Sequence, residues 1–101
     1  MIKHIILWKL RSDMDAEQKR AQAAVIKQQL EGLQGEVPGL LQIHVQTDGI
    51  LASSNADIML DCMLESEEAL KGYAVHPKHV HVANTYVRPY TEVRMCLDYK
   101  E

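Results

Sequence analysis

The chain opens with a short apolar stretch, Ile2 to Leu10, in which aliphatic residues and a tryptophan are interrupted by single lysine or histidine side chains. This composition is typical of a β-strand. The composition then changes. Ser12 and Asp13 are good helix N-cap residues, and Asp15 and Glu17 suit a first helical turn, where the helix dipole favours negative charge. We therefore expect a strand followed by a helix.

The helix is predicted to be amphipathic, because apolar residues recur at near-helical spacing while charged and amide residues occupy mostly the other faces. The residues expected to face the core are Met14, Ala21, Val25, Leu30 and Leu33. Glycines and a Pro-Gly pair between residues 32 and 39 end the helix. A helix with one apolar side predicts a sheet that is covered on one face.

Alternation of apolar and polar side chains predicts two later strands, Leu40 to Asp48 and Tyr90 to Tyr99. The residues expected on one side of the first of these are Leu41, Ile43 and Val45. Between the two strands, Ile58 to Leu64 is apolar with little alternation, which favours an interior strand.

A second helix is predicted from Ser66, a capping residue followed by two glutamates, to about Tyr73. His76-Pro77 ends or offsets it, and Pro77 can begin another short helix that runs to about Tyr86. The resulting order, β-α-β-β-α-β, predicts an α+β fold of the ferredoxin-like type with an antiparallel four-stranded sheet. Two such sheets meeting face to face would cover their free apolar faces, so we expect a homodimer.

Composition limits the partners. The 101 residues carry a net charge of −3, and the basic residues are scattered, so nucleic acid is not an expected partner. Neither a membrane-spanning segment nor a signal peptide is recognisable, which predicts a cytoplasmic protein without membrane attachment. Cys62 and Cys96 are predicted to be buried thiols. No glycine-rich phosphate loop is present, so no nucleotide cofactor is expected, and no other cofactor is predicted.

Several pieces of the sequence together resemble one known family. These pieces are Ile2 to Leu10, Pro38-Gly39-Leu40, Asp57, Leu64 to Leu70, and Tyr73 with His76-Pro77-Lys78-His79-Val80. The Tyr-X-X-His-Pro-X-His-Val string is the most specific of them. In this order they resemble the stress-responsive dimeric α/β-barrel (Dabb) family over nearly the whole chain. The resemblance implies one domain over residues 1–101 and a barrel-like homodimer.

The same resemblance implies candidate catalytic residues. The family includes a plant polyketide cyclase that makes olivetolic acid, whose catalytic pair is a tyrosine and a histidine of the corresponding string. These fall on Tyr73 and His79, and a histidine in the first strand of the cyclase matches His4. The pocket histidine in its third strand corresponds to Ile58.

Histidine moves protons near neutral pH, and a tyrosine hydroxyl can donate a hydrogen bond to a developing oxyanion. Tyr73 and His79 could therefore support aldol-type cyclisation or proton abstraction next to a carbonyl. The structural alternative is that the Tyr73 hydroxyl bonds to backbone and that His79 braces the loop. A metal held by His76, His79 and His81 is not predicted, because Pro77 interrupts their spacing and no nearby carboxylate or cysteine completes the set.

The residues and the resemblance together favour two alternative functions. One is a cofactor-independent cyclase, isomerase or lyase that acts on an apolar carbonyl compound, and the alternative is a non-catalytic stress-responsive or ligand-binding oligomer. A third possibility, a small monooxygenase of the same barrel shape, rests on fold analogy alone. A pocket of roughly a few hundred Å³ that reaches Tyr73 and His79 would favour the enzyme, and a filled core there would favour the alternative.

Overall fold

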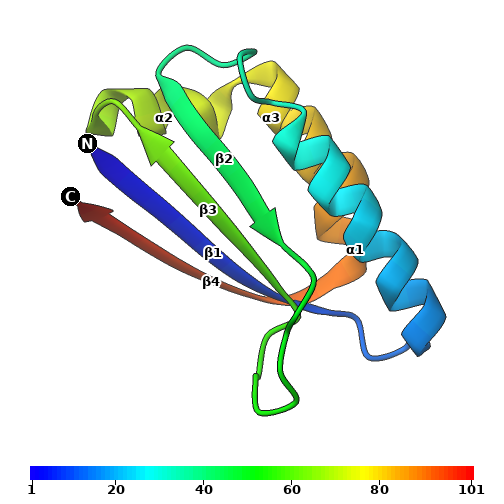
Figure 1. The fold of residues 1–101 in the computed structure, drawn as a ribbon. Helices are drawn as coiled ribbons and strands as arrows, with labels where there is room; N and C mark the ends of the chain where they lie inside the picture. Colours follow the sequence, from blue (N-terminus) through cyan, green and yellow to red (C-terminus); the bar gives the residue numbers. More distant parts are fainter.

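The computed structural model describes residues 1–101 and has the predicted order of elements. The elements are β1 (Ile2–Leu10), α1 (Ala16–Glu31), β2 (Leu40–Gln46), β3 (Ile58–Leu64), α2 (Glu67–Val75), α3 (Pro77–Val82), a π-helical turn (Ala83–Val87), a 3-10 turn (Arg88–Tyr90) and β4 (Thr91–Lys100). The strands form one antiparallel sheet in the order β2-β3-β1-β4, so β3 is an interior strand as predicted. The predicted ferredoxin-like class is confirmed (Figure 1).

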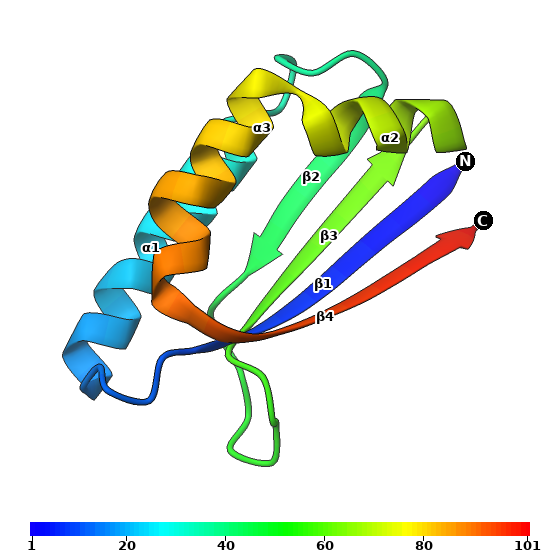
Figure 2. The ribbon, with the colours of Figure 1, turned by 180° about the vertical axis from the view of Figure 1, so that it is seen from behind.

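The helices cover one face of the sheet and leave the other face bare, as the views from both sides show (Figures 1 and 2). The pleat of β1 sorts its residues between these faces. Ile2, His4, Ile6, Trp8 and Leu10 are buried, and the residues between them are half-buried or exposed. The core therefore lies between the sheet and the helices. None of the helices has the length and apolar character needed to cross a bilayer.

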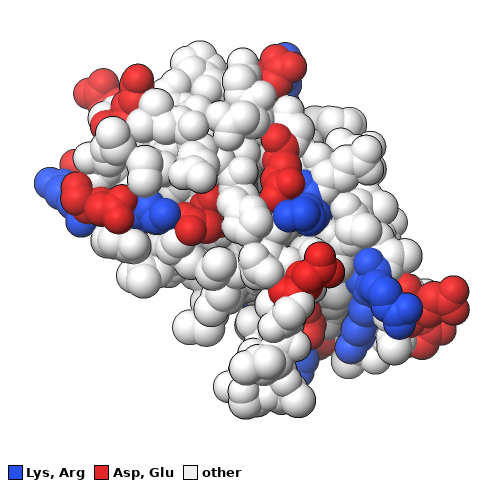
Figure 3. Space-filling view, viewed as in Figure 1, with Lys and Arg blue, Asp and Glu red and all other residues white.

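On the face seen in Figure 3, basic and acidic side chains lie next to each other in small groups. Wide uncharged areas separate these groups. The mixture of signs in this view contains no broad basic patch of the kind that binds a nucleic-acid backbone.

The start and the buried face of α1 differ from the prediction. Asp15, not Ser12 or Asp13, is the N-cap, and it forms a reciprocal capping box with Gln18. The buried helix residues are Ile26 and Leu30, whereas Ala21 is exposed and Val25 is half-buried. Ile26, Leu30 and Leu33 stand at i, i+4 and i+7, so the stripe that reaches the core is rotated relative to the predicted one.

The buried side of β2 also differs by one residue. The pairing with β3 has an irregularity between Leu40 and Gln42. Because a bulge shifts the alternation, Leu40 joins Ile43 and Val45 in the core, while Leu41 is exposed. The strand also ends at Gln46, two residues before the predicted Asp48.

The edge strand β4 has both of its sides exposed after Thr91. Arg94, Cys96 and Asp98 pair with Trp8, Ile6 and His4, so they lie on the helix side of the sheet. Their exposure indicates that the helix layer does not extend over this edge. The expectation of two buried thiols is therefore wrong for Cys96, which is exposed, and correct for Cys62.

Gly39 joins the end of the α1 loop to β2 in a conformation that requires glycine. Its φ is 80°, and a Cβ built on it would lie 2.6 Å from the Cβ of Ala69 in α2. Leu40 enters the core directly after this contact. The left-handed backbone and the close approach of α2 thus both require glycine at position 39.

We expect Gly39→Ala to lower the free energy of unfolding by roughly 2–4 kcal/mol, because left-handed strain and overpacking against Ala69 add together. Gly35→Ala is the matched control. Gly35 has a φ of 81° but nothing within 4 Å of its added Cβ, so it should show the strain alone. Urea unfolding of both variants measures the difference, and equal losses would contradict the packing contribution.

Candidate active site

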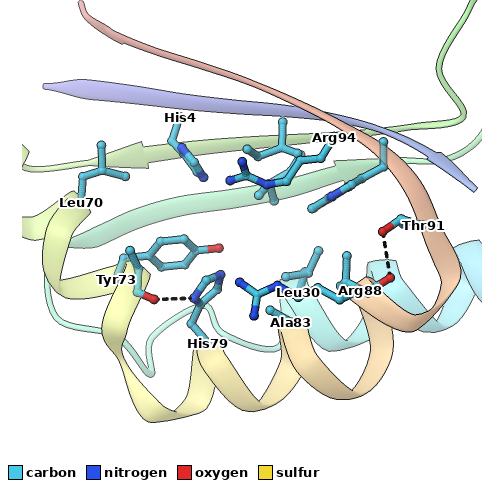
Figure 4. Close-up of a pocket in the computed structure, with 14 residues that line it drawn as sticks. His4, Leu30, Leu70, Tyr73, His79, Ala83, Arg88, Thr91 and Arg94 are labelled. Atoms are coloured by element: carbon cyan, nitrogen blue, oxygen red, sulfur yellow. Dashed lines mark hydrogen bonds between the residues drawn. The ribbon is translucent and has the colours of Figure 1, made fainter.

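A cavity of about 110 Å³ lies between the helix side of β1 and the segment from α2 to the start of β4. Its walls include all three residues singled out from the sequence: His4, Tyr73 and His79. Figure 4 shows the three side chains converging from β1, α2 and α3. Apolar residues such as Ile6, Leu30 and Leu60 form much of the remaining wall. The cavity is smaller than the few hundred Å³ expected of an enzyme of this kind.

Tyr73 lies on the last turns of α2, with 1% of its surface exposed. The hydroxyl group is buried and has no hydrogen-bond partner. Burial raises the pKa of Tyr73 above its ordinary value because the phenolate would be desolvated, and the neighbouring Cys62 thiol adds to the rise. Burial likewise raises the pKa of Cys62 to about 12. The Tyr73 group therefore stays an O–H donor throughout the physiological pH range.

His79 stands in the first turn of α3, which starts at Pro77 with His76 as its N-cap. Its ring centroid lies 4.3 Å from that of Tyr73. The Nδ1–H donates to the carbonyl of Ala74 at 3.2 Å, which leaves Nε2 as the acceptor of the neutral ring. Burial lowers the pKa of His79, because the charged ring would lose water. His79 is thus arranged as a neutral base at pH 7.

His4 is the one buried polar side chain of β1. Its Nδ1–H donates to the carboxylate of Asp98, its register partner on β4. The ring contacts Tyr73 edge to face, with centroids 5.8 Å apart. A carboxylate on Nδ1 fixes the tautomer and leaves Nε2 as an acceptor. Asp98 was not predicted, because the pairing of β1 with β4 decides which carboxylate meets His4.

The contacts of Tyr73 and His79 agree only in part with the two interpretations drawn from the sequence. Tyr73 and His79 meet through their rings, and no direct hydrogen bond joins them. The structural alternative is wrong for Tyr73, whose hydroxyl bonds to no backbone group, whereas His79 does brace the junction of α2 and α3 through Ala74. Ile58, which the resemblance matched to a pocket histidine, is a buried core residue.

Three further polar residues line the cavity and were missed from the sequence: Arg88, Thr91 and Arg94. Arg88 follows the π-helical turn, in which one extra residue per turn rotates every later side chain relative to an α-helix. Thr91 donates its hydroxyl to the carbonyl of Val87 at 3.1 Å (Figure 4). The sequence predicted a helix to about Tyr86 but gave no sign of its widening, so the direction of Arg88 could not be foreseen.

One group of side chains has donors of the kinds that zinc accepts. The ligand atoms of His4, Cys96 and Asp98 lie within 4.8 Å of one another, and the Cys96 sulfur is 3.9 Å from His4 Nδ1. That nitrogen already donates to Asp98, so the arrangement is a hydrogen-bonded pair beside a thiol. The histidines considered from the sequence do not share such a site, since His76 accepts from the Lys78 amide and His81 contacts Thr85.

The fold and the cavity define a ferredoxin-like α+β protein with a tyrosine and two histidines on one pocket wall. The model of the stress-responsive A/B barrel domain family, Dabb, matches residues 2–101. The chain belongs to this family. Comparison with curated proteins gave no match.

Solved structures with the same fold cover nearly the whole chain. A dimeric protein of unknown function with a ferredoxin-like fold from Bacteroides fragilis is 29% identical, with a TM-score of 0.90 over 99% of this chain and 95% of that one. A dimeric ferredoxin-like protein of unknown function from Thermobifida fusca is 22% identical, with a TM-score of 0.80 and coverages of 97% and 88%. A hydroxynitrile lyase from Passiflora edulis is 17% identical, with a TM-score of 0.76 and coverages of 97% and 90%.

The lowered pKa of His79 predicts a pH dependence of stability. In the unfolded chain His79 takes up a proton near pH 6.5, and in the folded chain only at lower pH. The stabilisation by neutral His79 is therefore present above pH 6.5 and is lost as the pH falls toward the folded pKa. NMR titration of the His79 ring should give a midpoint below 6.5.

His79→Gln should accordingly lose less stability than the unmodified protein between pH 7.5 and pH 5.5 in urea unfolding. His81→Gln, at an exposed histidine on the same helix, is the control and should leave this pH dependence unchanged. A His79 midpoint at or above 6.5 would contradict the burial argument.

Proposed function

We propose that this cavity carries out cofactor-independent proton transfer next to a carbonyl group, the step shared by cyclases, isomerases and lyases of carbonyl compounds. The observation that carries the proposal is the Tyr73 hydroxyl, which is buried without a partner beside the ring of His79. An unsatisfied buried hydroxyl costs stability. A substrate oxygen that accepts its hydrogen bond would remove that cost.

In the proposed reaction, Nε2 of His79 removes a proton from the carbon next to the carbonyl. The electron pair of the broken C–H bond forms the enolate, whose oxygen accepts the hydrogen bond of Tyr73. The enolate carbon then takes the proton back from His79 Nε2, or attacks a second carbonyl carbon in an aldol-type ring closure. In the ring closure the C=O π bond opens to an alkoxide, which takes the proton from His79 Nε2. His4, held by Asp98, supplies a second proton acceptor on the cavity wall.

Both pKa directions support these roles. A raised pKa keeps Tyr73 protonated as a donor, and a lowered pKa keeps His79 neutral as a base near pH 7. The cavity size favours a small substrate. The fold itself selects no reaction, because one fold supports many chemistries.

The proposal is tested by following exchange of the α-protons of 5-methyl-2-hexanone in D₂O by NMR. The folded protein should accelerate exchange above buffer, and His79→Ala should reduce that acceleration by about 10²–10⁴-fold, as for loss of a general base. Tyr73→Phe should reduce it by about 10²-fold or more. The same Phe variant should unfold at equal or higher urea concentration, because an unpaired buried hydroxyl is removed.

His76→Gln is the matched control, since His76 belongs to the same sequence string but does not line the cavity. Its exchange rate should equal that of the unmodified protein. Absence of exchange together with a ligand-induced rise in melting temperature would instead identify a non-catalytic ligand-binding protein.

We also propose that the protein is a homodimer whose two bare sheet faces pack together. The motivating feature is a row of exposed apolar residues on the face opposite the helices: Leu7, Val93, Met95, Leu97 and Tyr99. Met95 and Leu97 are 66% and 60% exposed, and such contiguous apolar surface is typical of an interface. The relatives from Bacteroides fragilis and Thermobifida fusca are dimeric, which supports a homodimer.

Light scattering at micromolar concentration should give twice the chain mass of 11.5 kDa. Leu97→Glu should shift the protein toward monomer, because a carboxylate would be buried unpaired at the contact. Val75→Glu, at a 73% exposed residue at the end of α2, should leave the dimer intact. A monomer in the unmodified protein would refute this arrangement.

A further inference from the structure

The charge of the cavity wall differs from that of the chain. The chain carries a net charge of −3, yet the cavity is lined by Arg88 and Arg94 and by no aspartate or glutamate. Figure 4 shows both guanidinium groups directed toward the space between His4 and His79. Arg94 reaches it from β4 and Arg88 from the turn that follows the π-helical segment. Two permanent positive charges therefore face the same small space as the Tyr73 hydroxyl.

Neither charge has an acidic partner within the chain. The cations that pair with carboxylates are Lys3, Arg11, Lys27, Lys78 and Lys100, and the carboxylates beside the histidines contact His4 and His44. Arg88 donates only to the neutral side-chain oxygen of Asn84. Asp98, the carboxylate on the helix side of β4, is held by His4. Two arginines that converge on one cavity without a carboxylate leave planar donors suited to a bound anion.

We propose that Arg88 and Arg94 bind a carboxylate of the ligand, so that the cavity takes a small oxo acid in preference to an uncharged ketone. This inference rests on the proposed function, because it assigns the carbonyl end of the same ligand to Tyr73 and His79. It replaces the apolar carbonyl compound expected from the sequence. Leu30, Leu60 and the other apolar wall residues would contact the short carbon chain between the two ends.

The electrostatics of the base agree with this assignment. Both arginines contribute to the lowered pKa of His79, although burial is the largest cause. A carboxylate bound between them would offset their field and make the imidazolium formed after proton removal easier to accommodate. The anion would thus both orient the substrate and assist the base.

The test compares levulinate, a five-carbon oxo acid, with 5-methyl-2-hexanone, in which an uncharged isopropyl group replaces the carboxylate. Calorimetric titration should show levulinate binding at least about tenfold more tightly, as expected for charge-assisted hydrogen bonds. Arg88→Gln with Arg94→Gln should abolish the preference and leave ketone affinity unchanged, which also shows an intact cavity. Each single variant should lose part of the preference.

Arg20→Gln is the matched control, because Arg20 is exposed on α1, forms no ion pair and does not line the cavity. It should keep the full preference. Equal binding of the two compounds to the unmodified protein would overturn the inference, as would an equal loss in Arg20→Gln and the double variant.

The same samples separate this inference from the proposed function. Arginine-dependent binding of levulinate without α-proton exchange in D₂O would support the anion site and refute catalysis. Exchange of the neutral ketone with no preference for levulinate would support catalysis and refute the anion site. Binding of neither compound would refute both.

Discussion

The pleat of β1 is the constraint on which the rest of the structure depends. This strand lies between β3 and β4, and successive side chains must point to opposite faces of the sheet. One face therefore carries Ile2, Ile6, Trp8 and Leu10 into the core, and His4 is carried with them. The other face presents Leu7 to the bare side of the sheet, where apolar residues of β4 continue the surface. The alternation of side chains along β1 thus contributes residues to the core, to the candidate site and to the candidate interface.

The polar groups of the cavity oppose stability, and their arrangement is consistent with use in binding. A tyrosine hydroxyl without a partner and a histidine with a lowered pKa both cost free energy in an apolar layer. The Tyr73 hydroxyl has no hydrogen-bond partner, while His79 and His4 are each held through Nδ1. Two rings are therefore fixed in orientation around a group that remains free to interact with a ligand.

The edge position of β4 explains how charged residues come to line the cavity. On the interior strand β3, residues on the helix side such as Leu60 and Cys62 are covered and apolar. On β4 the helix layer ends, so Arg94 and Asp98 can occupy the same face without losing their hydration. Arg88, which follows the π-helical turn, lines the same cavity. The positive charge of the cavity therefore comes from one residue on the edge strand and one residue just after the π-helical turn.

The sequence by itself determined the order of elements, the interior position of β3, the cap at Ser66 and the break at His76-Pro77, because these depend on local periodicity and backbone chemistry. The family resemblance added the three candidate residues on one cavity wall. Only the tertiary structure decided which stripe of α1 is buried, that Leu40 replaces Leu41, and that Asp98 meets His4. It also decided that Arg88 and Arg94 converge. Strand register, a bulge and a widened helical turn fix these contacts, and each depends on packing between segments distant in the chain, which local patterns do not encode.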